Sequence, residues 1–160
     1  MKDVYIRRYV PCDLDCVLAV RRDSIRNIAA RDYTPDQILA WAPDKEDRDA
    51  LATRFAGTLS WVAARNARDN DDLLGFINLD KGGYLDCLYI HSKHQGRGIA
   101  TALLQKLEAA ARDQRLSLLF SNVSITARPF FEGRGFKVVA AQKVTIRNQA
   151  YDNFRMEKRL

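Results

Sequence analysis

A glycine-rich turn joins a strand-like segment to the most helix-like segment of the chain, and this arrangement constrains the fold more than any other feature. Residues 84–90 alternate as a β-strand does, and they are followed by the turn Gln95-Gly96-Arg97-Gly98. The next residues carry an apolar stripe at helical spacing, made of Ile99, Leu103, Leu104, Leu107, Ala110 and Ala111. Gly96 and Gly98 have no side chain, and the first amides of a helix lack intrahelical partners. The turn therefore suits a phosphate group.

The remaining segments predict a mixed order of helices and strands. A strand at 4–9 is expected to precede three helices, at 13–30, 36–41 and 46–55, of which the second is capped by Thr34 and Pro35 and the third ends at Gly57. Strands at 59–64, 73–79 and 84–90, joined by polar turns at 66–72 and 80–83, predict an antiparallel meander. After the amphipathic helix we expect a strand at 116–122, a short helix at 127–134, and a hairpin of 138–147 and 151–157 that turns at Asn148-Gln149.

Length and composition favour one domain spanning residues 1–160. The chain is 47% hydrophobic and 29% charged, which is typical of a globular protein. It has no apolar stretch of membrane-spanning length and no apolar signal segment at its start, so we expect a soluble, cytoplasmic protein without a membrane partner. The three cysteines, Cys12, Cys16 and Cys87, lack the paired spacing of a zinc site, and we expect reduced thiols and no metal.

The positive charge is confined to the second half of the chain. Residues 1–80 carry 12 Lys and Arg against 14 Asp and Glu, whereas residues 81–160 carry 14 against 6. The basic residues are scattered singly and are not interleaved with aromatic residues, so we expect no nucleic-acid partner. A small polyanionic ligand fits this distribution better than a polymer does.

The turn does not match the motifs of two phosphate-binding families. A P-loop requires a Lys directly after its last glycine, and none is present. A dinucleotide-binding fold requires a third glycine and an acidic residue about twenty positions later, but Thr101 stands at the glycine position and the following strand has no carboxylate.

Two motifs instead resemble the GNAT superfamily of acyl-CoA-dependent N-acyltransferases. The first is Leu88-Tyr-Ile90 followed by Gln95-Gly-Arg-Gly-Ile-Ala100, and the second is Ala127-Arg-Pro-Phe-Phe-Glu-Gly-Arg-Gly-Phe136. The resemblance in detail covers about residues 73 to 140. It implies an α+β fold whose central, mostly antiparallel sheet of six or seven strands is flanked by helices and splayed between its fourth and fifth strands.

The resemblance also implies where acetyl-CoA would bind. In the family, the end of the fourth strand holds the pantetheine arm, the turn amides hold the pyrophosphate, and the helix of the second motif lies along the arm. The corresponding cofactor-binding residues are Leu88, Tyr89, Ile90, Gln95, Gly96, Arg97, Gly98, Ile99, Ala100, Thr101, Ser124, Phe130 and Phe131. Ordinary core packing is an equal alternative for Phe130.

The chain departs from the family pattern at two positions. Many members have a tyrosine at the position of Phe131, which protonates the departing thiolate, and phenylalanine cannot donate that proton. Many have an arm-contacting asparagine at the position of Ser124, whose side chain is shorter. A thiol has a pKa of about 8.5, so the anion is tolerable near neutral pH and the missing acid does not exclude catalysis.

The amine acceptor would face the fourth strand and the first helices. Side chains at 84, 86, 88 and 90 are expected to share the face that looks into the acceptor cleft, which makes Asp86 the candidate base and Tyr84 its neighbour. A solvated aspartate at the strand end is the alternative. Tyr33 and Trp41 are candidate substrate-binding residues, with turn and core roles as alternatives. We expect the two histidines, His91 and His94, to be solvated loop residues.

The sequence therefore predicts an acetyl-CoA-dependent N-acetyltransferase that acts by direct attack of a bound primary amine on the thioester. The acceptor is a small molecule or a peptide, and the chain is a monomer or a homodimer. A non-catalytic acyl-CoA-binding or sensor module of the same fold is the alternative, which the phenylalanine at position 131 keeps open.

Overall fold

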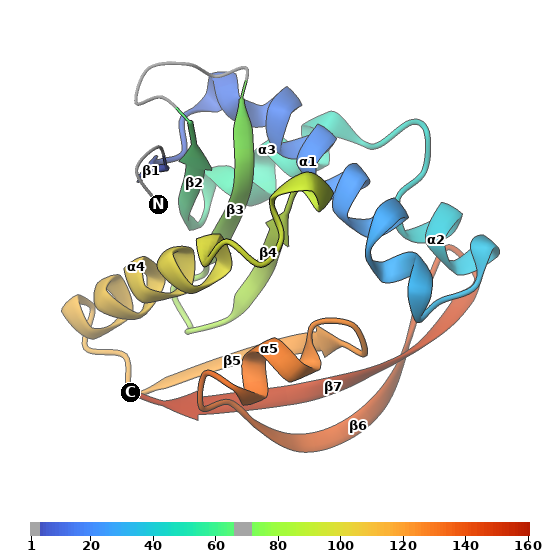
Figure 1. Ribbon diagram of the computed structural model, residues 1–160. Coiled ribbons are helices and arrows are strands. Elements are labelled where there is room, and N and C mark those ends of the chain that lie inside the picture. Colours follow the sequence, from blue (N-terminus) through green and yellow to red (C-terminus); the bar gives the residue numbers. More distant parts are fainter. Residues whose placement is uncertain (1–3, 66–71) are drawn as a thin grey trace.

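The chain forms two antiparallel sheets whose strands meet at one edge (Figure 1). This arrangement comes from a computed structural model that describes residues 4–65 and 72–160. The first sheet has the order β1-β2-β3-β4 and the second has the order β5-β7-β6. Their bounds are β1 Tyr5–Arg8, β2 Leu59–Ala64, β3 Leu73–Leu79, β4 Leu85–Ile90, β5 Leu118–Ser124, β6 Lys137–Ile146 and β7 Gln149–Arg159. The predicted α+β fold, with a sheet that opens between its fourth and fifth strands, is confirmed. So is the antiparallel meander β2-β3-β4, although residues 66–71 of its first turn lie outside the described residues.

Two of the described helices begin where a side chain caps them. Thr34 Oγ1 accepts a hydrogen bond from Gln37 N at 3.3 Å, which confirms the predicted cap of the second helix, and Gln37 Oε1 accepts one from Thr34 N at 2.8 Å, which completes a capping box. The third helix begins two residues later than predicted, because Asp47 accepts from Ala50 N at 2.9 Å and is itself the cap. The helices are α1 Leu14–Asn27, α2 Pro35–Trp41, α3 Arg48–Ala56, α4 Ile99–Asp113 and α5 Arg128–Glu132.

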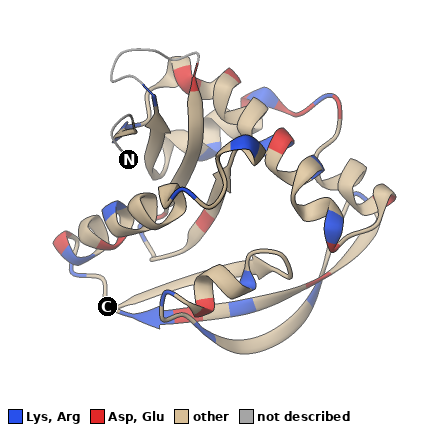
Figure 2. Cartoon of the chain, in the orientation of Figure 1, with Lys and Arg blue, Asp and Glu red and all other residues tan. Residues whose placement is uncertain are grey.

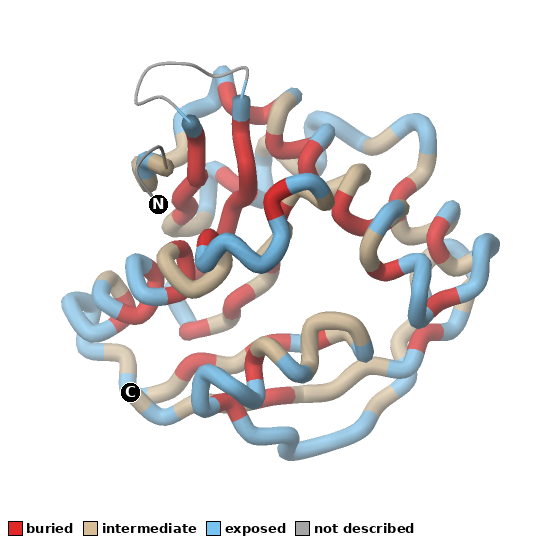
Figure 3. Tube along the Cα trace, viewed as in Figure 1, coloured by how far each residue is buried: buried red, intermediate tan, exposed pale blue. Residues whose placement is uncertain are grey.

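Strand β3 lies at the centre of the core. All seven of its residues are buried, because α1 covers one face of the first sheet and α4 covers the other (Figures 1 and 3). Phe76 packs with residues of α1 and α3, whereas its neighbour Ile77 packs with the apolar stripe of α4. The stripe residues Leu103, Leu104 and Leu107 are at most 2% exposed. The packing of this stripe against the sheet fixes the start of α4, and with it the glycine-rich turn, relative to β4.

The two sheets touch at a short junction. Phe120 N donates to Gly83 O at 3.0 Å, and Tyr84 and Phe120 form an isolated parallel bridge. The buried Ser121 hydroxyl donates to Leu85 O at 2.6 Å. Beyond these contacts β4 and β5 belong to different sheets.

A bulge in β4 corrects the predicted alternation of its side chains. Asn78 pairs with Cys87 but Leu79 pairs with Leu85, so Asp86 is an extra residue on that strand. From there, Cys87 and Tyr89 pack on the α1 side of the sheet, while Leu88 and Ile90 pack on the α4 side. The expectation that positions 84, 86, 88 and 90 share one face was therefore wrong, because a bulge depends on the partner strand and leaves no local pattern.

Replacement of Gly83 by alanine is expected to destabilise the junction. Gly83 has φ +91°, and a Cβ there would lie 2.4 Å from Leu118 O. Backbone strain alone should lower the free energy of unfolding by about 1–3 kcal/mol, measured by urea denaturation. Gly82→Ala is the matched control, because its Cβ would meet only the Asp80 side chain at 3.4 Å. Equal stability of the two variants would contradict the role of the junction.

Candidate functional site

A cavity of about 600 Å³ lies where β4 ends and α4 begins. It is lined by every predicted cofactor-binding residue except Arg97, which is exposed. The predicted residues among its lining are Leu88, Tyr89, Ile90, Gln95, Gly96, Gly98, Ile99, Ala100, Thr101, Ser124, Phe130 and Phe131. We call it the turn cavity. The structure thus brings the two sequence motifs, about thirty residues apart, onto one hollow.

The glycine-rich turn has the backbone that its sequence predicts. Gly96 and Gly98 have φ of +70° and +77°, and Gly98 is the N-cap of α4. A Cβ on Gly96 would meet no atom within 4 Å, so the turn needs glycine there for its conformation, and the space beside it is open. The first amides of a 15-residue helix therefore border the turn cavity.

Basic residues line this cavity or lie next to it. Arg31 and Arg134 line it, and Arg134 Nη2 donates to Thr101 Oγ1 at 2.7 Å. Lys93 and Arg97 lie on the segment between β4 and α4 (Figure 2). Together with the helix amides, these side chains make the cavity suited to an anionic ligand.

The two histidines are not solvated loop residues as predicted. His94 is 9% exposed and lines the turn cavity. Burial lowers the pKa of its imidazole, and the charges of Arg65 and Arg97 lower it further. His91 Nδ1 accepts from Lys93 N at 3.2 Å and lies 3.4 Å from Asp23. The prediction failed because β4 leads into a turn that packs against α1.

A second cavity, of about 450 Å³, lies on the α1 side of β4. The predicted catalytic residues Tyr84 and Asp86 and the predicted substrate-binding residues Tyr33 and Trp41 all line it. We call it the aromatic cavity, because its aromatic lining comprises Tyr33, Trp41, Tyr84, Tyr89 and Tyr151. Three residues line both cavities, namely Trp41, Tyr89 and Ser124. The two cavities therefore adjoin.

Asp86 is neither solvated nor isolated. Its side chain is 6% exposed and forms an ion pair with Arg54 through Oδ1. Burial raises the pKa of the Tyr84 hydroxyl, and the nearby Asp86 charge raises it further. The bulge in β4 thus turns a carboxylate into the aromatic cavity and sets it beside an arginine of α3.

Tyr89 presents a protonated phenol between the cavities. Burial raises its pKa to about 12, although the Arg21 charge and a hydrogen bond with Trp41 act in the opposite direction. The hydroxyl therefore stays protonated throughout the neutral range and can donate a hydrogen bond.

The predicted substrate residues Tyr33 and Trp41 belong to an aromatic cluster. The Tyr33 ring lies 5.5 Å from Trp41 and 5.8 Å from Tyr151, centroid to centroid. Its hydroxyl donates to Asp152 O at 2.9 Å and accepts from Ile125 N at 3.0 Å. Tyr33 is 9% exposed. It therefore shapes the cavity wall with its polar group already bonded, whereas Trp41 is half-buried.

Several charged and polar residues of the aromatic cavity escaped sequence reasoning. They come from α1, the segment before α3, α3, the β6–β7 turn and β7, and they are Arg21, Glu46, Arg54, Arg147 and Asn153. None belongs to a motif, and only the tertiary fold gathers them.

Comparison with known proteins decides the family. Residues 29–160 match the family model described as "Acetyltransferase (GNAT) domain". A protein of Escherichia coli strain K12 with the name "Uncharacterized N-acetyltransferase YafP" is 35% identical over 156 residues, which cover 98% of this chain and 96% of that protein. The chain belongs to the GNAT acetyltransferase family. It is accordingly an acyltransferase of the N-acetyltransferase type.

Solved structures of GNAT proteins superimpose over nearly the whole chain. A GCN5-related N-acetyltransferase from Rhodopseudomonas palustris matches with a TM-score of 0.90 and 30% identity, covering 98% of this chain and 95% of that one. The PaiA N-acetyltransferase of Thermoplasma acidophilum, solved in complex with coenzyme A, matches with a TM-score of 0.79 and 22% identity, covering 98% and 99%. In the described part of this GNAT chain, no helix is long and apolar enough to cross a membrane.

The two residues that depart from the GNAT pattern, Phe131 and Ser124, both make structural contacts. Phe131 is 3% exposed, and its ring packs edge-to-face on Phe136, with centroids 5.0 Å apart. Ser124 Oγ accepts from Ala127 N at 3.1 Å and so supports the start of the second motif. Phe130 is half-buried and lines the turn cavity, while it also packs against the core. Position 131 therefore contributes apolar packing in this chain.

Proposed function

We propose that this GNAT enzyme transfers the acetyl group of acetyl-CoA to a primary amine, with acetyl-CoA in the turn cavity and the amine in the aromatic cavity. The observation that carries the proposal is that the two cavities adjoin at Trp41, Tyr89 and Ser124. One has an anion-binding turn and the other has a buried carboxylate. A thioester at the shared wall would be open to attack from the amine side.

Acetyl-CoA would be held mainly by backbone groups. The pyrophosphate would lie on the turn 95–101, where the left-handed glycines leave open space. The pantetheine arm would run along residues 88–90 into the gap between β4 and β5, since these strands separate beyond the Tyr84–Phe120 bridge. Arg31 and Arg134 line the same cavity and add positive charge for the phosphates.

The transfer would proceed by direct attack. The amine nitrogen forms a bond with the thioester carbonyl carbon, the C–S bond breaks, and the CoA thiolate leaves with the bonding electrons. An alkyl amine has a pKa of about 10.4, so it must lose a proton for the attack. Asp86 is the proposed acceptor of that proton, because it is the carboxylate that the β4 bulge turns into the aromatic cavity. Arg54 is bonded to its Oδ1, and the proton would go to Oδ2, which accepts only a long contact from Cys87 Sγ at 3.8 Å among the described residues.

Tyr89 is the proposed partner of the leaving thiolate, in place of the missing tyrosine at position 131. Its phenol, with a pKa near 12, is a weaker acid than a thiol with a pKa of about 8.5. Full proton transfer to the thiolate would be unfavourable. Tyr89 would therefore stabilise the thiolate through a hydrogen bond and keep its own proton.

The proposal predicts amine-dependent release of free thiol from acetyl-CoA above the rate of a blank without enzyme. It further predicts that Gly96→Glu abolishes acetyl-CoA binding in calorimetry, because a carboxylate would face the pyrophosphate.

The neutral control is Gly96→Gln, which has the same size and the same backbone strain at φ +70°. It should bind more tightly than the glutamate variant, and circular dichroism checks that both variants fold. Unaltered affinity in the glutamate variant, or thiol release that is independent of amine, would contradict the proposal.

Replacement of Asp86 by asparagine should lower kcat by about 10²–10⁴-fold, the range typical of general acid-base catalysis. Acetyl-CoA affinity should stay within twofold, since Asp86 does not line the turn cavity. Asp15→Asn is the matched control, because Asp15 is also paired with an arginine, Arg48, but is exposed and lines neither cavity. Equal activity of Asp86→Asn and the parent across the pH range would remove Asp86 as the base.

Replacement of Tyr89 by phenylalanine should lower kcat by about 10-fold, the effect of one hydrogen bond to a charged group. Because Tyr89 stays protonated up to a pH near 12, the pH–rate profile between pH 6 and pH 9 should keep its shape. A profile that lost its alkaline limb in this variant, or an unchanged kcat, would contradict this role.

A further inference from the structure

We infer that the acceptor is a small amine that also carries a carboxylate, and that Arg147 binds this carboxylate. The inference rests on the proposed function and narrows its substrate class. It starts from the charges that line the aromatic cavity, which are three arginines and three acidic residues, namely Arg21, Arg54, Arg147, Glu46, Asp47 and Asp86.

Two of the arginines and all three acidic residues are already engaged. Arg21 Nη1 lies 3.0 Å from Glu46 Oε1, and Arg54 is paired with Asp86. Asp47 accepts from Ala50 N at 2.9 Å, at the positive end of α3. Within residues 4–65 and 72–160, Arg147 is the lining guanidinium without a carboxylate partner.

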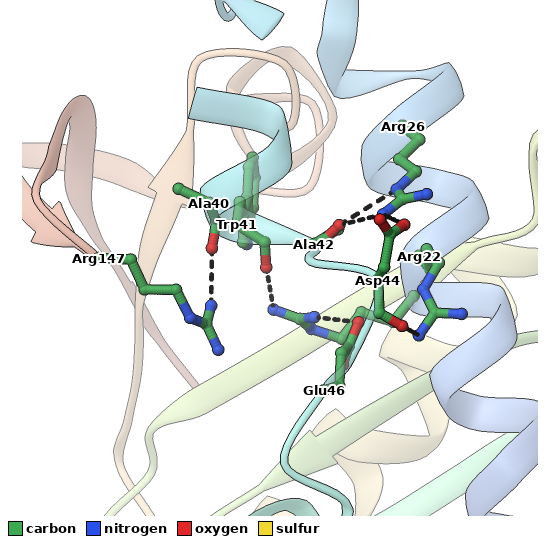
Figure 4. Close-up of polar contacts among 9 residues, drawn as sticks. Arg22, Arg26, Ala40, Trp41, Ala42, Asp44, Glu46 and Arg147 are labelled. Atoms are coloured by element: carbon green, nitrogen blue, oxygen red, sulfur yellow. Dashed lines mark hydrogen bonds and ion pairs between the residues drawn. The ribbon is translucent and has the colours of Figure 1, made fainter. Parts of the chain in front are cut away.

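Arg147 is held in place at the end of the cavity. It lies in the two-residue turn between β6 and β7, where Arg147 and Asn148 have φ of +45° and +65°. The predicted turn at Asn148-Gln149 is thus shifted by one residue. Arg147 Nη1 donates to Ala40 O at 2.6 Å, across to the end of α2 (Figure 4). A guanidinium has five N–H donors in a planar fork, so the remaining ones can take a carboxylate in a bidentate pair.

The neighbouring arginines show what an engaged guanidinium looks like in this region. Arg26 donates to Ala42 O and to Asp44 Oδ1, and Arg22 donates to Asp44 O (Figure 4). Asp44 thus lies with α1 and not with Arg147. The acidic residues of the loop between α2 and α3 contact α1 and the start of α3. None of them is paired with Arg147.

The opposite end of the cavity offers acceptors to an amine. Asn153 Oδ1 is buried and has no hydrogen-bond partner among the described residues. Asn153 pairs in register with Ser124, which lines both cavities. A buried oxygen without a hydrogen-bond donor lowers the free energy of unfolding, because its desolvation is not compensated. An ammonium or amine between Asn153 and Asp86 would supply that donor next to the shared wall.

The walls between these two ends favour an apolar side chain. Tyr33, Trp41 and Tyr151 form one aromatic group, and Val144 and Ile146 line the same cavity. A volume of about 450 Å³ suits a small molecule. An amino acid with an aromatic or branched apolar side chain could place its amine at Asn153 and Asp86, its carboxylate at Arg147 and its side chain against the apolar walls.

The test compares matched pairs of amines that differ only in the carboxylate: phenylalanine with phenethylamine, and leucine with isopentylamine. Thiol release from acetyl-CoA gives kcat/KM for each. The parent enzyme should prefer the carboxylate-bearing member of each pair. Arg147→Gln should lower kcat/KM for phenylalanine by about 10- to 100-fold, the effect of a lost charged hydrogen bond, and leave phenethylamine unchanged.

Arg159→Gln is the control, because Arg147 and Arg159 are both exposed and carry the same charge, but Arg159 lines neither cavity. It should leave kcat/KM unchanged for both phenylalanine and phenethylamine. The phenethylamine rate shows that the Arg147 variant is folded. Equal or better turnover of the amines without a carboxylate, or an equal loss for both members of a pair, would overturn the inference and leave the proposed function standing. Absence of thiol release with every amine, despite acetyl-CoA binding, would overturn both.

Discussion

The short junction between β4 and β5 is the constraint on which the rest of the structure depends. Phe120 N donates a hydrogen bond to Gly83 O, and the Ser121 hydroxyl donates one to Leu85 O. Beyond this point the strands belong to separate sheets. A longer ladder would close the space where the turn cavity lies. The β6–β7 hairpin, which carries Arg147, is attached to this junction through β5, and hydrogen bonds from Arg147 to Ala40 O and from Tyr33 to Asp152 O also hold it against α2 and the segment before α2. The junction thus sets where the two sheets part, and these helix contacts fix the hairpin across the site.

Burial on both faces of the first sheet gives this opening a rigid frame. β3 is buried along its whole length, and the α4 stripe packs on one face while α1 and Phe55 pack on the other. The fully buried side chains each contribute about 1.5–3 kcal/mol. The edge strand β6 is exposed at residues 137–141. Apolar burial therefore stabilises mainly the first sheet and α4, which hold the glycine-rich turn. Fixed backbone amides can bind an anion without the cost of ordering the turn at the moment of binding.

Sequence reasoning succeeded where the determinant was local. The cap at Thr34, the stripe of α4 and the turn around Gly98 each depend on residues a few positions apart, and the structure has them in the predicted places. It failed at the side-chain alternation of β4, where the bulge depends on pairing with β3, and at His94, which α1 and the turn bury together. The unpaired Arg147 and the orphaned Asn153 carry no sequence signal at all, because their roles follow from which charges the other elements leave unmatched.

The division of charge along the chain does not map onto the two cavities. The acidic first half supplies Arg21 and Arg54 to the aromatic cavity, and the basic second half supplies Asp86. Arg54 keeps the buried Asp86 compensated, and a buried carboxylate stripped of its partner is costly. On the proposed function, the amine meets Asp86 at Oδ2 while Arg54 stays on Oδ1, so the cost of desolvating that carboxylate is already offset before the amine binds. A substrate carboxylate gains more at Arg147, to which no carboxylate of the described residues is paired. The affinity of the site would then come chiefly from the carboxylate end and its reactivity from the amine end.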